Sequence, residues 1–195
     1  MRSSRRFASL VFSIGLLLAL TSCGSQQKMS TQSLAPGQGA AAPGGGSMLN
    51  APIPQSVLNL PLFDASGKTF TLNSLKGKSV VIADFLTSCQ EICPMTTVNM
   101  RVIGDAVAAS SLKDSVKVLE ISVDSGRDTA SRMSAYQSLY NDKNWTLASG
   151  VEPSLSKFWN FFGNSYTKKP YSADEMKSLP VDWQTGKKNT YDVSH

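Results

Sequence analysis

The feature that most constrains the fold is an apolar, β-branched run that ends at two cysteines four residues apart. Residues 80–86 predict a buried strand, and apolar positions with helical spacing follow Cys93. These positions are Met95, Val98, Val102, Ile103, Ala106 and Val107. Cys89 and Cys93 therefore lie at a strand-to-helix turn, with Pro94 in the first turn of the helix. The unpaired N–H groups and the helix dipole at such a turn favour a thiolate over a thiol.

The spacing of the two cysteines limits their chemistry. Four residues place both sulfurs on one helical face, near enough to form a disulfide or to share one metal ion. A structural disulfide across so short a loop would restrain little entropy in the unfolded chain. Redox or metal chemistry therefore explains the pair better than a structural bridge does.

Residues 1–22 have the three parts of an export signal. Arg2, Arg5 and Arg6 form a basic start, residues 7–20 are apolar, and small residues precede Cys23. Residues 20–23 resemble the lipobox of bacterial lipoproteins, in which the signal is cut before a lipid-bearing cysteine. We therefore expect a lipoprotein signal peptide at 1–22 and a lipid anchor on Cys23. The folded part would then face the periplasm or another oxidising, extracytoplasmic space at a bacterial membrane.

Residues 23–55 predict a flexible tether. Gly, Ala, Pro, Ser and Gln dominate this stretch, which has almost no charge and no periodic apolar pattern. Such a segment buries too little apolar surface to offset the entropy of ordering it.

The charge balance gives no indication of nucleic-acid binding. The formal net charge is +5, but three of the 19 basic residues are the arginines of the export signal. The rest of the chain has 16 basic and 14 acidic residues, which leaves a formal net charge of +2. A basic face for nucleic acid is therefore not expected.

Residues 56–195 predict one α/β domain, with a central sheet flanked by helices. A hairpin is expected over 58–72, strands over 80–86, 116–123 and 145–149, and helices over about 95–107, 130–140 and 153–162. Residues 168–188 are expected to be irregular, and 190–193 to begin another strand.

Few further side chains are candidates for a site. His195 is the single histidine, and a lone histidine indicates little by itself. Two thiolates and one imidazole, however, are a ligand set that suits copper better than structural zinc. Asp124 follows a predicted strand, where it either supports a site at that sheet edge or caps the next loop. Met95 and Met100 are expected to pack rather than to bind metal.

Several segments together resemble one family. Residues 87–94, Thr-Ser-Cys-Gln-Glu-Ile-Cys-Pro, resemble the T-x-C-x-x-x-C-P motif of Sco (SenC) proteins, which are thioredoxin-like copper carriers. Residues 75–85 resemble the family's first core strand, and residues 122–129 its S-V-D-P-x-R-D-T loop. Residues 145–150 resemble its W-x-x-L-T-G segment, and residues 191–195 its Tyr-x-x-x-His segment.

The resemblance implies a thioredoxin-like fold and a specific site. Cys89, Cys93 and His195 would bind one copper ion, with Asp124 as a supporting carboxylate. The ion, or electrons from the Cys89/Cys93 redox pair, would go to the copper-binding subunit of cytochrome c oxidase or to another copper or thiol protein. The closing strand and helix of the fold are expected to be missing from residues 56–195.

The residues allow two other interpretations of the function. The same cysteine pair could serve an extracytoplasmic thiol-disulfide oxidoreductase or a thiol peroxidase, although reductases of this type usually have two residues between their cysteines. Alternatively, the chain could be a structural lipoprotein with an inert disulfide.

Overall fold

The computed structural model describes residues 40–41, 47–49, 51–141 and 144–195. The expected signal peptide and Cys23 lie outside these residues. Within the tether expected at 23–55, Ala40–Ala41 (β1) and Ser47–Met48 (β2) form a short antiparallel pair. No helix in the described part of the chain is both long and apolar enough to cross a membrane.

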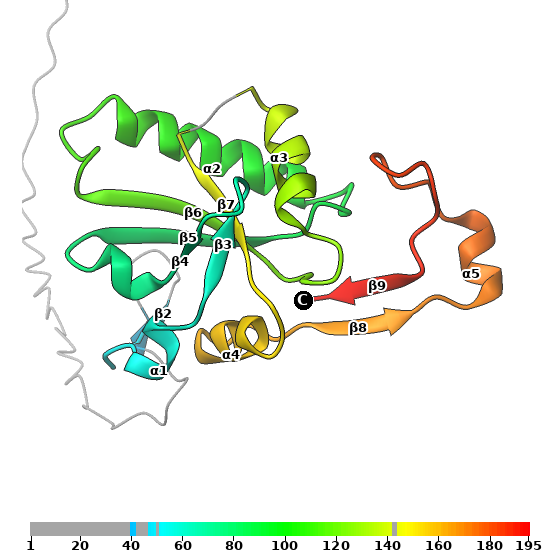
Figure 1. The fold of residues 1–195 in the computed structure, drawn as a ribbon, viewed down its shortest axis with the longest axis horizontal. Helices are drawn as coiled ribbons and strands as arrows, with labels where there is room; N and C mark the ends of the chain where they lie inside the picture. Colours follow the sequence, from blue (N-terminus) through cyan, green and yellow to red (C-terminus); the bar gives the residue numbers. More distant parts are fainter. Residues whose placement is uncertain (1–39, 42–46, 50, 142–143) are drawn as a thin grey trace, which may run out of the picture. The chain divides into compact units, whose positions relative to one another are not determined.

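Five strands form the central sheet, in the order β4-β3-β7-β6-β5 (Figure 1). They are Leu62–Asp64 (β3), Thr69–Phe70 (β4), Ser79–Phe85 (β5), Val116–Ser122 (β6) and Thr146–Ser149 (β7). β5, β6 and β7 are parallel, whereas β3 is antiparallel to both of its neighbours. This is the mixed sheet of the thioredoxin-like fold, and it confirms the fold class predicted from the sequence.

Helices cover both faces of the sheet (Figure 1). Cys93–Ala108 (α2) and Ala130–Ser138 (α3) lie on one face, and Gln55–Leu58 (α1) and Ser154–Phe161 (α4) lie on the other. Leu72–Leu75 (η1) is a short 3-10 turn before β5. The predicted helices at 130–140 and 153–162 and the strands at 116–123 and 145–149 are confirmed to within two residues at each end. α1 was not predicted.

The alternation of side chains along β6 separates two hydrophobic cores. Leu119 and Ile121 point to the α1/α4 face, where they pack with residues such as Leu155 and Phe158. Val118 points to the α2/α3 face, where it packs with residues such as Met133. β6 therefore contributes side chains to a hydrophobic core on each face of the sheet, as expected for a parallel strand between two helical layers.

The apolar stripe predicted for α2 does not face the core. Met95, Val98 and Val102 are 67%, 42% and 54% exposed, and the buried residues of α2 are Cys93, Thr97, Met100 and Gly104. The expected packing of Met100 is confirmed, whereas that of Met95 is wrong. Gly104 explains the rotation of the helix, because a Cβ there would lie 2.8 Å from the carbonyl oxygen of Asn144. α2 therefore packs through the face that carries Gly104 and Thr97, and Gly104 allows the close approach to the backbone at Asn144.

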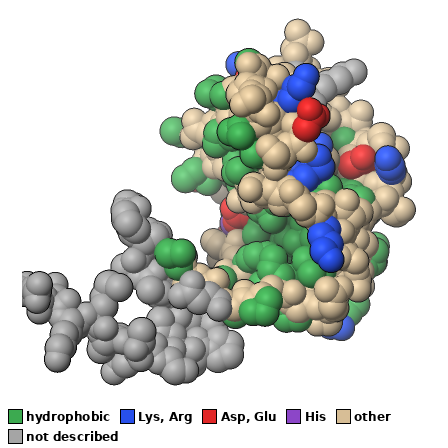
Figure 2. All heavy atoms as spheres, turned by 90° about the vertical axis from the view of Figure 1, so that its left-hand side faces the viewer, with side chains coloured by type: hydrophobic (Ala, Val, Ile, Leu, Met, Phe, Trp, Pro, Cys, Tyr) green, Lys and Arg blue, Asp and Glu red, His purple; other side chains and the backbone are tan. Residues whose placement is uncertain are grey.

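β5 was predicted as a buried strand, but it lies at the edge of the sheet. Five of its seven residues are only half-buried, among them Val80 and Ile82. Figure 2 shows hydrophobic side chains gathered in a hollow on the side of the molecule that lies at the left in Figure 1. An edge strand pairs on one side only, so its side chains are less enclosed than those of β6.

Residues 167–195, here called the arm, leave the sheet and return to it. Thr167–Pro170 (β8) pairs antiparallel with Tyr191–Ser194 (β9), and Ala173–Ser178 (α5) lies between them (Figure 1). The strand expected at 190–193 is confirmed. The irregular structure expected at 168–188 is wrong, because this range contains most of β8 and all of α5. A capping box between Ser172 and Glu175 begins α5.

Candidate metal and redox centre

The two cysteines lie at the transition from β5 to α2. Cys93 is the first residue of α2 and Pro94 follows in the first turn, as predicted. Cys89 lies in the preceding loop rather than on the helix, and the backbone N–H of Cys93 donates to its Sγ at 3.4 Å. The two thiols are therefore neighbours because the loop curls over the helix N-terminus, and not because they share a helical face. Cys89 and Cys93 are not joined in a disulfide.

The thiols differ in charge. A hydrogen bond from the Cys93 side chain, opposed by burial and helped by backbone N–H groups at the helix start, lowers the pKa of Cys89 to about 5. The same hydrogen bond and burial raise the pKa of Cys93 far above its usual range. At neutral pH, Cys89 is a half-buried thiolate and Cys93 is a buried thiol that donates to it. The lowered pKa of Cys89 gives the pair one thiolate, which is the form that acts as a nucleophile or as a metal ligand.

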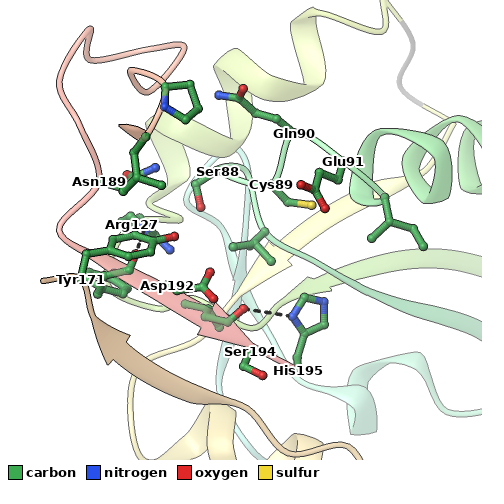
Figure 3. A pocket seen from close by; sticks show the side chains of 16 residues that line it. Ser88, Cys89, Gln90, Glu91, Arg127, Tyr171, Asn189, Asp192, Ser194 and His195 are labelled. Carbon is green, nitrogen blue, oxygen red and sulfur yellow. Dashed lines mark hydrogen bonds between the residues drawn. The ribbon is translucent and has the colours of Figure 1, made fainter. Parts of the chain in front are cut away.

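Cys89 and His195 line the same pocket (Figure 3). The pocket has a volume of about 720 Å³ and lies between the cysteine loop and the arm. His195 follows the last residue of β9, and its side chain is 20% exposed. Its Nδ1 lies 3.4 Å from the backbone oxygen of Val193. The fold therefore brings His195 to the same pocket as Cys89, although the two residues are 106 positions apart in the sequence.

The three predicted ligands are near one another but are not assembled. Across the described residues, no three His, Cys, Asp or Glu side chains converge closely enough to hold a metal ion. Cys93 does not line the pocket, while Cys89 and His195 do. The donor types fit copper, because two thiolates and an imidazole are soft to intermediate ligands. If the three residues are to bind one ion, Cys93 must lose its proton, and the side chains of Cys89, Cys93 and His195 must move towards one another.

Asp124 contacts β9, the strand that leads to His195. It is fully buried after β6, and its Oδ1 accepts a hydrogen bond from the Tyr191 hydroxyl at 2.7 Å. Arg127 pairs with Asp124, donates to the backbone oxygen of Tyr191 at 3.0 Å and lies over the Tyr191 ring at 4.1 Å. Asp124 does not line the pocket of Cys89 and His195. It therefore fastens the start of β9 rather than facing the site itself.

A second set of buried contacts, which the sequence did not predict, fixes the cysteine loop. Thr87 hydrogen-bonds Asp128 and Arg132 through its hydroxyl, and its backbone oxygen accepts from Trp183 Nε1 at 2.7 Å. Arg132 also donates to Asp182 Oδ1 at 2.9 Å. Burial raises the pKa of Asp128 to about 6, whereas hydrogen bonding by Arg132 lowers that of Asp182. Because these partners are far apart in sequence, no local motif could identify them.

Comparison with known proteins gives consistent results. The family model SCO1/SenC matches residues 57–180, a range that contains Cys89, Cys93 and Asp124 and ends before His195. A SCO1 protein homolog of Bacillus subtilis is 28% identical over 136 residues, which cover 68% of this chain and 69% of that protein. A putative copper-binding protein of Stutzerimonas stutzeri is 28% identical over 94 residues, which cover 48% of this chain and 46% of the other.

A solved structure shows the same fold. Arabidopsis thaliana ScoI, whose crystal structure has copper bound, aligns with a TM-score of 0.52 at 21% identity. The alignment covers 69% of this chain and 74% of that one. At this identity the likeness concerns the fold alone.

Proposed function

Because the chain belongs to the SCO1/SenC family, we propose that it binds one copper ion through Cys89, Cys93 and His195. The observation that carries this proposal is the placement of the Cys89 thiolate and His195 on one pocket, with Cys93 directly beside Cys89. The thiolate supplies a soft ligand at neutral pH, and the half-exposed position leaves room for exchange with another protein. Copper bound there would be cargo to be handed on.

We also propose the copper centre of cytochrome c oxidase as the destination. The same cysteine pair can donate two electrons to an acceptor disulfide as it closes to its own disulfide, so the chain would deliver either copper or electrons. Formation of that disulfide removes both thiolate ligands. Copper loading would therefore depend on the redox state of Cys89 and Cys93.

A lipid on Cys23 would hold the domain at a bacterial membrane, facing the periplasm or extracytoplasmic space. The support is the lipobox-like segment at residues 20–23, which follows an apolar run in the sequence. Cells that express the protein should incorporate a labelled fatty acid into it, and Cys23→Ala should abolish the label. Equal labelling of the variant would contradict the anchor.

Copper titration of the reduced protein tests the copper proposal. We expect one copper per chain and, with Cu(II), a thiolate-to-copper charge-transfer band. Cys89→Ser combined with Cys93→Ser should remove the band, and Asp114→Ala, an exposed change remote in sequence from the proposed ligands, should not. A folded, fully reduced protein that binds no copper would contradict the proposal.

His195 separates this function from dithiol exchange. A thiol-disulfide oxidoreductase or thiol peroxidase needs only Cys89 and Cys93, so His195→Ala should leave its turnover largely intact. A copper carrier should lose more affinity with the same change than the roughly 10-fold to 100-fold that loss of an outer partner of a ligand costs, because His195 is itself a proposed ligand. The family comparisons favour the carrier.

A further inference from the structure

Three aromatic side chains in contact lead away from the cysteine loop. The ring centroid of Tyr136 lies 6.2 Å from that of Trp183 and 5.3 Å from that of Tyr140. These are the spacings of aromatic rings in contact. Tyr136 is buried, whereas Trp183 and Tyr140 are half-buried. The Trp183 indole N–H donates to the backbone oxygen of Thr87, two residues before Cys89, so the rings join that loop to the surface.

Hydroxyl groups of the same cluster form a directed series of hydrogen bonds. Tyr140 donates to the Tyr136 hydroxyl at 3.1 Å, and Thr97 donates to Glu120 Oε1 at 2.9 Å. The Thr97 oxygen lies 3.2 Å from the Tyr136 hydroxyl. Because a hydroxyl has one hydrogen and that of Thr97 goes to Glu120, Tyr136 is the donor to Thr97. Each hydroxyl therefore donates towards the fully buried carboxylate of Glu120.

This series suits the one-electron oxidation of a tyrosine. Burial raises the pKa of Tyr136, so its phenol is neutral and must release a proton when it loses an electron. That proton moves to Thr97 as Thr97 passes its own to Glu120, over contacts short enough for proton transfer. Burial also raises the pKa of Glu120 to about 7. The ionised Glu120 is therefore a better proton acceptor than an ordinary glutamate.

Two other tyrosines donate to a carboxylate without this combination. Tyr166 donates to Glu152, where hydrogen bonds outweigh burial and lower the pKa. Tyr191 donates to Asp124, which two cations also contact and thereby hold in the ionised form. Among these three tyrosines, Tyr136 has the acceptor that binds a proton most readily.

We propose that Tyr136 is a redox-active residue that passes single electrons from the cysteine loop to a one-electron oxidant at the surface. The oxidant takes one electron from Tyr136 by way of Tyr140. The phenol proton moves through Thr97 to Glu120, which leaves a neutral tyrosyl radical. This step needs no bound copper and goes beyond the proposed function.

A second step restores the tyrosine. The radical takes one electron from the Cys89 thiolate through Trp183, and the proton returns from Glu120 to the phenol. In sum, the oxidant gains one electron and the thiolate becomes a thiyl radical, with no net change in protons. Arg132 lies over the Trp183 ring at 5.2 Å, but its pairing with Asp182 offsets the charge that would oppose oxidation of the indole.

Pulse radiolysis of the reduced, metal-free, full-length protein tests both steps. Every protein carries Cys23→Ser, which leaves Cys89 and Cys93 as its only thiols. Azide radicals, which oxidise tryptophan and tyrosine by one electron, are generated at about pH 8.5, above the pKa of Glu120. The phenoxyl absorption reports the tyrosyl radical, and circular dichroism checks that each variant is folded.

The first step is measured with Cys89→Ser and Cys93→Ser, so that no thiolate competes. Tyr136→Phe should remove most of the phenoxyl absorption, and Glu120→Gln, which cannot accept the proton, should also lower it. Tyr166→Phe is the matched control, a tyrosine with a carboxylate partner outside the cluster, and should have little effect. An absorption that Tyr136→Phe leaves unchanged overturns the proposal, as does an equal loss in Tyr166→Phe. Equal absorption with and without Glu120→Gln contradicts the proton path.

The second step is measured by the decay of the radical, at protein concentrations low enough that the rate no longer depends on them. Decay should be severalfold faster with Cys89 and Cys93 present than with both replaced by serine. Trp183→Phe, which removes the hydrogen bond to Thr87, should slow it towards the thiol-free rate. Trp159→Phe is the control, because that indole bonds a backbone oxygen outside the path. The same decay rate with and without the thiols overturns the link to the cysteine loop.

Discussion

At the level of single residues, the two cysteines differ in which of them carries the charge. Cys93 is the buried donor and Cys89 the thiolate that accepts, so the reactivity of Cys89 depends on a proton held by its neighbour. A hydrogen bond to a charged group is worth about 1.5–3 kcal/mol, or one to two pH units. This dependence can be measured in the reduced protein without any metal.

We predict that alkylation of Cys89 by iodoacetamide has its midpoint at about pH 5, well below the ordinary value of 9.0. The reactive thiolate forms as pH rises through the pKa, so the rate should already be near its plateau at pH 7. Cys93→Ala should move the midpoint up by about one to two units, because the donor is lost. Cys93→Ser, which keeps a donor, should move it less. A wild-type midpoint above pH 8, or identical profiles in the wild type and Cys93→Ala, would contradict the assignment.

Sequence reasoning identified Cys89, Cys93 and Pro94 because their chemistry is local to one turn. It could not identify the hydroxyl series that ends at Glu120, since its members meet only when α2 and α3 pack against β6. Asp124 was proposed as a supporting carboxylate, and the structure shows its partners, Tyr191 and Arg127. The role of Cys89, Cys93 and Asp124 in metal binding stays a prediction.

At the level of elements, β9 positions His195 through contacts at its opposite end. Tyr191 begins the strand, and its hydroxyl reaches the buried carboxylate of Asp124. Within the described residues, β9 pairs with β8, and Arg127 also donates to the backbone oxygen of Tyr191. Loss of the hydroxyl should therefore loosen β9 against the sheet while leaving the main cores intact.

We predict that Tyr191→Phe weakens copper binding about tenfold, the lower end of the effect of outer partners on metal affinity. Isothermal titration calorimetry of the reduced protein measures the change. Tyr166→Phe is the matched control, because that hydroxyl bonds Glu152 and Ser156 instead. The role assigned to β9 fails if both variants bind copper as the wild type does.

A buried carboxylate joins α2 to the sheet. Glu120 on β6 accepts hydrogen bonds from Thr97 of α2 at 2.9 Å and from the Trp145 indole at 2.8 Å. Burial raises its pKa to about 7 from 4.5. The folded state therefore holds a proton that the unfolded chain releases between these values, and stability falls as pH rises through this window.

We predict that Glu120→Gln removes this part of the pH dependence. In the wild type the contribution is fully present below about pH 4.5 and is lost as pH passes about 7, a difference on the order of 3 kcal/mol. Urea unfolding at pH 5 and at pH 8 should show a smaller difference between the two pH values for Glu120→Gln than for the wild type. Equal differences would mean that Glu120 is ionised in the folded state throughout.

The element level also shows what the sequence could predict about the fold. Strands β6 and β7 and helices α3 and α4 follow from apolar runs, a Thr129 cap and aromatic spacing, all of which are local. The outward turn of α2 does not, because a close approach at Gly104 and polar contacts through Thr97 outweigh the apolar stripe. α5 is different, since the Ser172 and Glu175 capping box is visible in the sequence and predicts a helix start.

At the level of the whole molecule, the site depends on the docking of the arm on the sheet. The arm carries His195, and one buried ion pair, Arg132 with Asp182, joins it to α3. Trp183 of the arm adds a hydrogen bond to Thr87, two residues before Cys89. Arg132 and Trp183 therefore take part both in holding the arm and in fixing the cysteine loop.

We predict that Arg132→Ala destabilises the protein by about 3–5 kcal/mol, because it leaves Asp182 and Asp128 buried without a counter-charge. Hydrogen exchange should show lost protection in the arm before the central sheet. Lys177→Ala breaks an exposed ion pair with Asp174 and should cost at most about 0.5 kcal/mol. Similar losses in the two variants would contradict this account of the arm.

The central claim is that one copper ion joins three side chains that the metal-free fold holds near one another. X-ray absorption of the copper-loaded protein and of His195→Ala tests it most directly, because the spectrum counts the sulfur and nitrogen ligands. We predict two sulfurs and one imidazole nitrogen in the wild type, and loss of the imidazole contribution in the variant. A wild-type spectrum without two sulfurs, or one that His195→Ala leaves unchanged, would contradict the claim.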